Sequence, residues 1–197
     1  HIFLSYNSYL PQGSVSMYKN SIKNEILDWA IHILIALIIT FVVVTFVMQR
    51  TIVYGYSMEP TLEEGDNLLV EKISPRLKKF EYGDIVVIDV PERLKGEKNP
   101  IIKRIIALEN DTVEIRDGKV YVNGKMITEP YIKGDYTMER NPEYSKMIVP
   151  EGKVYVLGDN REAFITDSRT LGAIDENRII GKALLRIYPF NKFGTLK

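Results

Sequence analysis

The sequence predicts a mostly β protein, in which a single N-terminal transmembrane helix is followed by an antiparallel β-rich domain. Residues 30–48 form an apolar run of 19 residues without a formal charge, counting His32 as neutral. After Arg50 the sequence changes to short runs of β-branched and alternating residues, separated by Gly, Asp, Asn and Pro. Asp117-Gly118 lies between two such runs and is typical of a two-residue hairpin turn.

The apolar run predicts a membrane anchor over residues 29–49, preceded by an N-terminal tail, residues 1–28. A helix that rises ~1.5 Å per residue needs roughly 20 apolar residues to cross ~30 Å of hydrocarbon. A buried core helix and a cleaved signal peptide are the alternatives, but the run is longer than a signal-peptide core and ends without small residues. Residues 1–16 are expected to be unstructured or non-native, because Met17 opens a short basic segment, MYKNSIK.

Residues 50–197 are expected to form the β-rich domain. Asn123-Gly124 gives a second turn signal soon after the first. The polar stretches 92–100 and 133–145 are expected to be loops or small excursions from the sheet. The runs that predict strands are NLLVEKI, DIVVIDV, IIKRIIAL, TVEIRDGKVYVNGKMI, KVYVLGD and IIGKALLRIY.

Composition excludes several classes of function. The 26 basic and 26 acidic side chains give a formal net charge of zero, so no overall field favours nucleic acid as a partner. The absence of cysteine excludes disulfides, thiolate zinc sites and a cysteine nucleophile. His1 and His32 are the only histidines, and neither is placed to serve an aqueous active site, which excludes a Ser-His-Asp triad and a histidine-rich metal centre. A serine hydrolase would therefore need a carboxylate, a lysine or an amino terminus as its base.

Two segments contain candidate catalytic residues. Ser57 follows the apolar run by about nine residues, and at ~3.3–3.6 Å per residue it lies within about 30 Å of a membrane surface. Lys103 lies in a predicted strand and shares its face with Ile101 and Ile105. Desolvation among isoleucines would lower the pKa of this lysine and make it a better base. Taken singly, each residue is more typical of a structural serine or a surface lysine.

Six short blocks, taken in order, resemble the signature blocks of the type I signal peptidases, which are Ser-Lys dyad serine proteases of the bacterial leader peptidase family. The similarity covers nearly all of the chain from the apolar run to Tyr188-Pro189-Phe190. The blocks are Gly55-x-Ser57-Met58-x-Pro60-Thr61-Leu62, Gly65-Asp66, Gly83-Asp84-Ile85-Val86-Val87, Lys103-Arg104, Gly158-Asp159-Asn160-Arg161 and Asp167-Ser168-Arg169.

The resemblance implies a serine endopeptidase that removes signal peptides from secretory preproteins after small-x-small motifs. Ser57 would be the nucleophile and Lys103 the general base, acting through an acyl-enzyme. Gly55, Asp167 and Arg169 would support the site or its oxyanion. Met58, Asp84, Ile85 and Val86 would contact the substrate, the last three through a sheet-edge strand.

The resemblance also implies a cell-membrane protein whose residues 50–197 lie outside the cytoplasm, in contact with lipid. Lys19 and Lys23 before the anchor and Arg50 after it favour this orientation only weakly. The expected partners are secretory preproteins and membrane lipid, with no nucleic acid, no cofactor and no metal.

The chain departs from the family pattern at two places. Ala107 and Glu109-Asn110-Asp111 replace the usual glycines after Lys103, and residues 162–166 form a five-residue stretch without serine where the family has four residues with one. The alternatives are a catalytically impaired, membrane-anchored homologue that binds peptides and a related Ser-Lys autoprotease.

Overall fold

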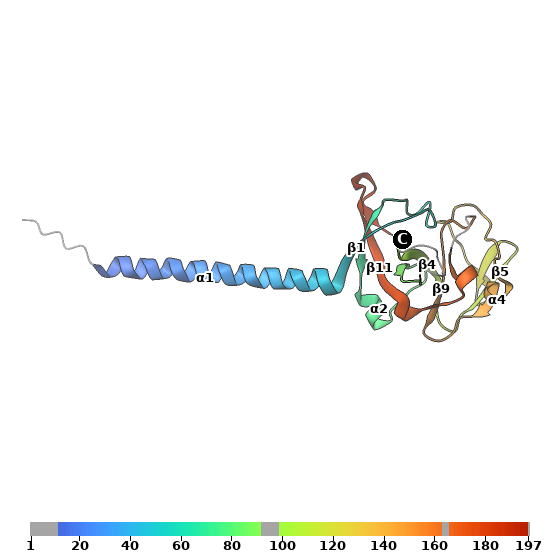
Figure 1. The fold of residues 1–197 in the computed structure, drawn as a ribbon, viewed down its shortest axis with the longest axis horizontal. Helices are drawn as coiled ribbons and strands as arrows, with labels where there is room; N and C mark the ends of the chain where they lie inside the picture. The colour runs from blue at the N-terminus through green and yellow to red at the C-terminus, as the bar shows by residue number, and fades with distance from the viewer. Residues whose placement is uncertain (1–11, 92–98, 163–165, 197) are drawn as a thin grey trace, which may run out of the picture. The chain divides into compact units, whose positions relative to one another are not determined.

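The computed structural model describes residues 12–91, 99–162 and 166–196, and only the backbone of residues 12–22. The chain divides into two compact units, His1–Val44 and Thr45–Lys197. The first contains the long helix α1 and the second contains the strands (Figure 1). The predicted mostly β fold with one N-terminal apolar helix is confirmed.

Helix α1 spans Gln12–Val42 and continues as a π-helical turn, Val43–Val47. The sequence from residue 12 to residue 50 contains no proline and one glycine, so nothing in it breaks the helix. The segment Lys23–Val47 has 25 residues with a mean hydropathy of 2.9. By length and composition it can cross a membrane.

The helix differs from its predicted boundaries at both ends. It begins at Gln12, within the residues 1–16 that we expected to be unstructured, because adding residues to an existing helix is far easier than starting one. Residues 1–11 lie outside the described part of the chain. Strand β1, Met48–Ile52, begins inside the predicted anchor, because Met48 pairs with Glu71 of the neighbouring strand.

The larger sheet of the β-rich unit is antiparallel and has the order β1-β2-β11-β3-β4-β9-β10, with β12 added to β11. Only β1 and β10 lie at the ends of this order, so β3 and β4 are interior strands. The remaining bounds are β2 Asn67–Glu71, β3 Ile85–Ile88, β4 Ile101–Ala107, β9 Lys153–Leu157, β10 Ile174–Asp175, β11 Ile179–Tyr188 and β12 Gly194–Thr195.

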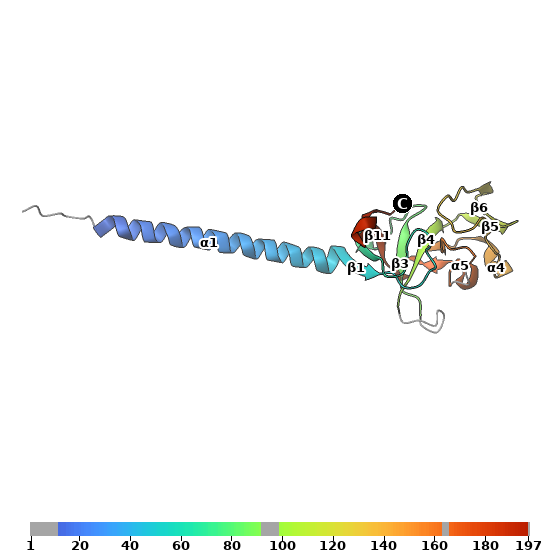
Figure 2. The same cartoon turned by 90° about the horizontal axis from the view of Figure 1, so that it is seen from above.

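The smaller sheet has the order β7-β6-β5-β8 and lies at the end of the unit away from β11 (Figure 2). Its strands are β5 Thr112–Arg116, β6 Lys119–Val122, β7 Lys125–Met126 and β8 Lys146–Ile148. The turn Asp117-Gly118 has φ values of 51° and 73°, the left-handed pair that a tight hairpin requires. Asn123-Gly124 repeats the geometry, so both predicted turns are confirmed.

Short helical segments connect the strands, and they are α2 Ile73–Leu77, α4 Pro142–Ser145, α5 Ser168–Leu171, η2 Glu176–Arg178 and η3 Phe190–Lys192. Helix α4 occupies the end of the stretch 133–145 that we expected to be irregular. Asn141 caps this helix, since its side chain accepts a hydrogen bond from Glu143 N–H. Of the other predicted loop, residues 92–98 lie outside the described part of the chain.

Strand β4 contributes to all three hydrophobic clusters of the unit. Ile102 packs in a cluster with residues of β2, β3 and β11, whereas Ile105 packs in a second cluster with residues of β3 and β9. Ile106 and Ala107 pack against the smaller sheet. Each buried isoleucine stabilises the fold by roughly 1.5–3 kcal/mol. The strand that carries Lys103 is therefore held on both faces and on both sides.

Candidate active site

Ser57 lies in the loop between β1 and β2, whose position is set by the core. Val53, Met58 and Leu62 of this loop are buried in the same cluster as Ile102. Leu62 N–H donates to Met58 O at 2.8 Å, so the chain turns tightly just after Ser57. Ser57 itself is half-buried between these anchors. Packing of its neighbours therefore positions the serine without enclosing it.

Lys103 meets Ser57 from the middle of β4. Its Nζ donates hydrogen bonds to Ser57 Oγ at 2.6 Å and to Ile102 O at 2.7 Å, and the residue is 2% exposed. Lys103 pairs across the ladder with Val86, which packs in the same cluster as Ile101 and Ile105. The apolar face inferred from strand alternation is thus the one observed. The structure brings the two catalytic candidates, 46 residues apart in the sequence, into direct contact.

The Asp159 carboxylate connects the strand of Lys103 to the loop of Ser57 through an ion pair and a hydrogen bond. Arg104 donates to Asp159 from Nε at 2.9 Å and from Nη2 at 2.7 Å, and both residues are almost fully buried. Thr61 Oγ1, at the end of the Ser57 loop, donates to the same carboxylate at 2.5 Å. Hydrogen bonds to an ionised group are among the stronger ones in proteins. Asp159 therefore fixes β4 and the Ser57 loop relative to each other.

Asn160 makes two further hydrogen bonds to the Ser57 loop. Its backbone N–H donates to Ser57 O at 3.1 Å, and its side-chain Nδ2 donates to Tyr56 O at 3.2 Å. Asn160 is 5% exposed, and its backbone forms an isolated parallel bridge with Lys133. The peptide groups on both sides of Ser57 are thus hydrogen-bonded to one residue.

Comparison with known proteins identifies the family of this chain. The model of the family described as signal peptidase, peptidase S26, matches residues 26–188. The signal peptidase I of Bacillus licheniformis is 35% identical over 177 residues, covering 86% of this chain and 92% of the relative. The signal peptidase IB of Staphylococcus aureus (strain COL) is 36% identical over 187 residues, covering 87% of this chain and 94% of the relative.

The chain belongs to the signal peptidase family, peptidase S26. It is accordingly a serine endopeptidase of the signal peptidase I type that removes signal peptides from secretory preproteins. A crystal structure of a signal peptidase I from Enterococcus faecalis V583 is also similar, at 31% sequence identity with a TM-score of 0.44. It covers 53% of this chain and 96% of its own.

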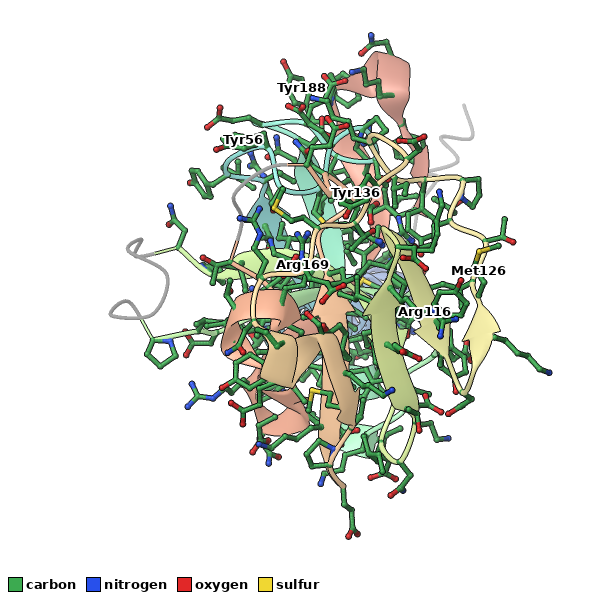
Figure 3. The ribbon with its side chains drawn as sticks, turned by 90° about the vertical axis from the view of Figure 1, so that its right-hand side faces the viewer. Tyr56, Arg116, Met126, Tyr136, Arg169 and Tyr188 are labelled. Atoms are coloured by element: carbon green, nitrogen blue, oxygen red, sulfur yellow. The ribbon has the colours of Figure 1, made fainter. Side chains whose placement is uncertain are left out.

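Asp167 and Arg169 of this signal peptidase form a buried pair behind the site. Asp167 Oδ2 accepts hydrogen bonds from Arg169 Nη2 at 2.8 Å and from Gly158 N–H at 3.2 Å. Arg169 Nη1 donates to Arg161 O at 3.0 Å. Arg169 lies in the interior of the unit, whereas Tyr56 lies at its periphery (Figure 3). The pair therefore holds the backbone on both sides of Asp159 and Asn160.

The four residues predicted to bind the substrate are buried, although Asp84 and Ile85 line a cavity of about 350 Å³. Met58 is 1% exposed and anchors the Ser57 loop in the core. Ile85 and Val86 lie in β3; Val86 is paired with β11 on one side and β4 on the other, whereas Ile85 is paired only with Arg104 of β4. Asp84 is also buried and forms an ion pair with Lys182 at 2.6 Å. That β3 flanks the substrate stays a prediction, but its residues from Val86 onward are paired on both sides and have no unpaired backbone groups to offer a peptide.

Gly55 lies two residues before Ser57 and has a φ of 73°, a conformation that glycine adopts without strain. It carries no side chain that could donate to an oxyanion. It lets the backbone turn between Val53, which is buried, and Ser57, which is half-buried. Of the five-residue stretch 162–166, in which the chain departs from the family pattern, residues 163–165 lie outside the described part of the chain.

Tyr131 stacks its ring on the guanidinium group of Arg104, the residue paired with Asp159. Its ring centroid lies 4.0 Å from Arg104 Cζ, and its hydroxyl donates to Glu129 at 3.1 Å. Burial raises the pKa of the Tyr131 phenol, and the neighbouring Glu129 carboxylate raises it further. The phenol therefore stays protonated and keeps this hydrogen bond. A cavity of about 350 Å³ is lined by both Tyr131 and Arg104, but not by Ser57 or Lys103.

Sequence reasoning did not assign roles to Thr61, Glu129 or Asn160. Thr61 and Asn160 lie inside blocks that the sequence singles out, but their hydrogen-bond partners come from segments 98 and 104 residues away. Only folding shows which polar side chain of each block faces the Ser57 loop. Among the described residues, no group of three or more His, Cys, Asp or Glu side chains could hold a metal ion.

Proposed function

We propose that Ser57 is the nucleophile and Lys103 the general base of this signal peptidase. The observation that carries the proposal is the 2.6 Å contact between Lys103 Nζ and Ser57 Oγ, made by a lysine that is 2% exposed. Burial disfavours the ammonium form of lysine relative to the neutral amine. Only the neutral amine has a lone pair that can accept the proton of Ser57.

The reaction then follows from the positions of these two groups. Lys103 Nζ takes the proton of Ser57 while Oγ attacks the scissile carbonyl carbon, and the carbonyl π electrons move to its oxygen. Collapse of this tetrahedral species breaks the C–N bond, and the Lys103 ammonium returns its proton to the leaving amine. Lys103 next takes a proton from a water molecule that attacks the acyl-enzyme, and it then gives that proton to Ser57 Oγ.

The Ser57 backbone N–H is the proposed donor to the oxyanion. No acceptor for this N–H exists among the described residues, whereas the carbonyl groups of Tyr56 and Ser57 are both hydrogen-bonded. A preorganised donor of this kind costs no reorganisation when negative charge develops on the substrate oxygen. Gly55 supplies no hydroxyl, so a second donor would have to come from elsewhere.

We place the substrate beside the first residues of β4 in place of β3. Strand β9 pairs with β4 only from Arg104 onward, while β3 pairs with β4 from Ile101. Among the described strands, Ile101 and Ile102 thus have a neighbour on one side only. An extended peptide added there, as a further strand of the sheet, would run next to Ser57.

We also propose that Lys23–Val47 spans the cell membrane and that residues 50–197 lie outside the cytoplasm. The length and hydropathy of the helix support the first part, and Lys19 and Lys23 before it support the second. Protease added to intact, wall-stripped cells should digest the β-rich unit. Protection in intact cells combined with digestion after lysis would show the reverse orientation.

The test of the mechanism uses the detergent-solubilised full chain and a labelled preprotein whose cleavage position is mapped. Ser57→Ala and Lys103→Met should each abolish cleavage in a folded protein, because the two residues act as a unit. Lys79→Met, an exposed lysine, is the matched control and should leave the rate unchanged. Retention of more than a tenth of the rate in either dyad variant would exclude this mechanism. Binding of uncut peptide by the unaltered chain would instead indicate the peptide-binding homologue.

A further inference from the structure

The peptide group between Tyr56 and Ser57 contains the proposed oxyanion donor. A peptide group is planar, and in the trans form its C=O and N–H bonds point in opposite directions. Whatever fixes the direction of Tyr56 C=O therefore also fixes the direction of Ser57 N–H. Tyr56 O accepts two hydrogen bonds, from Glu59 N–H within the loop and from Asn160 Nδ2 across the fold, each 3.2 Å long.

Asn160 also controls the next peptide group. Its backbone N–H donates to Ser57 O at 3.1 Å, so the two peptide planes that meet at the Ser57 Cα are both hydrogen-bonded to Asn160. Two planes held in this way define both backbone dihedral angles of Ser57. The direction of Ser57 N–H toward the substrate then depends on Asn160, together with the Glu59 N–H that also donates to Tyr56 O.

Asn160 is itself fixed firmly enough for this task. Gly158 N–H is held by Asp167, and Asp159 is held by Arg104 and Thr61. Lys133 N–H donates to Asp159 O at 2.8 Å. Asn160 is 5% exposed, so little solvent competes for its amide. A buried, anchored amide can hold a carbonyl group more precisely than a solvated one.

We propose that Asn160 is the positioning residue of the oxyanion site, and that its side-chain amide aims the Ser57 N–H at the substrate oxygen. The proposal rests on Ser57 being the nucleophile. Asn160 does not touch the substrate, so its effect reaches the reaction only through the Tyr56–Ser57 peptide group. Removal of a whole oxyanion donor costs ~10²- to 10³-fold in kcat. A misaimed donor that remains present should cost less, about 10- to 100-fold.

The decisive variant is Asn160→Asp, which keeps the size and the backbone N–H but places a carboxylate oxygen opposite Tyr56 O. Asn160→Ala removes the amide without adding charge and carries the test should the aspartate variant fail to fold. Asn67→Asp is the matched control, because Asn67 is also buried and donates from Nδ2 to a backbone carbonyl, Gly65 O, at 2.9 Å. The control should leave cleavage unchanged.

The measurement compares cleavage with the binding of two peptides of the same sequence on the full chain in detergent. One ends in an aldehyde, to which Ser57 Oγ adds to form a hemiacetal whose oxygen occupies the oxyanion position, and the other ends in an alcohol, which cannot be attacked. Asn160→Asp should lower kcat and the aldehyde affinity by the same 10- to 100-fold factor. It should leave KM and the alcohol affinity within about twofold.

The outcomes separate this inference from the proposed mechanism. Ser57→Ala should lose cleavage and bind the aldehyde no better than the alcohol, and if it does not, the dyad assignment fails whatever Asn160 does. With that control satisfied, unchanged kcat and aldehyde affinity in a folded Asn160 variant would overturn the role of Asn160 alone. An equal loss of aldehyde and alcohol affinity would overturn it as well, since this would show general disruption of the binding site.

Discussion

Replacement of Asp159 by Asn tests whether the buried Arg104–Asp159 pair holds the active site together. The carboxylate accepts three hydrogen bonds from two other segments, at 2.9, 2.7 and 2.5 Å. Removal of one partner from a buried ion pair costs ~3–5 kcal/mol. The asparagine keeps one acceptor oxygen, so we expect about 3 kcal/mol. In a chain of this size that corresponds to a fall in Tm of about 6–12 °C.

The assay is thermal unfolding of the detergent-solubilised chain, followed by near-ultraviolet circular dichroism. The matched control is Glu114→Gln, because Glu114 pairs with Arg116 at 3.6 Å and with Lys146 at 3.4 Å on the surface. Exposed pairs of this kind contribute little, so the control should change the free energy of unfolding by less than about 0.5 kcal/mol. The double variant Arg104→Met/Asp159→Asn should be less unstable than the sum of its single changes.

The reasoning would be refuted if Asp159→Asn lowered Tm no more than Glu114→Gln does. It would also be refuted by strictly additive changes in the double variant, since the loss in each single variant is attributed to the shared interaction. A large fall in activity without a fall in Tm would indicate a role in activity and not in stability. Asp159 would then orient the Ser57 loop through Thr61 without contributing to stability.

Three further changes test other parts of the structure. Gly181→Ala should lower the free energy of unfolding by ~1–3 kcal/mol, because the new Cβ would lie 2.4 Å from Val70 Cγ1 and 2.5 Å from Glu71 O. Gly194→Ala is the control, since a Cβ there would have no atom within 4 Å. Equal Tm values for the two variants would contradict the close packing at Gly181. Burial raises the pKa of the Glu176 carboxyl in the folded state. The contribution of this carboxyl to stability is therefore greatest below the pKa of an ordinary carboxyl group, and it is lost as the pH rises through the raised pKa of the folded state. Glu176→Gln should therefore raise Tm at pH 8 and not at pH 4, relative to the exposed control Glu151→Gln, and a gain at pH 4 alone would reverse the sign. Cleavage by the unaltered chain should rise from pH 6 to pH 9 as Lys103 loses its proton, and a flat profile, with chemistry limiting the rate, would argue against a lysine base.

Local patterns determined the broad features of this protein. An uncharged run of 19 residues predicts a membrane-length helix, and two Asx-Gly turns predict hairpins, because both depend on residues that are close in the sequence. Strand alternation placed Lys103 on an apolar face. Neither of the two histidines is placed to serve an aqueous active site, which left lysine among the few possible bases. The exact ends of the helix were not determined in this way, since Met48 joins a strand only when Glu71 is there to pair with it.

Tertiary structure alone decided which residues surround Ser57 and Lys103. Met58 and Val86 look equally available in the sequence, but Met58 turns into the core and Val86 lies in a strand with neighbours on both sides. Asn160 looks like one polar residue among several until folding sets its amide 3.2 Å from Tyr56 O. The physical reason is that strand order and loop packing join segments about a hundred residues apart, and no local propensity encodes such a pairing. The sequence by itself determined a serine, a lysine and a membrane-length helix, and the fold decided how the serine is held.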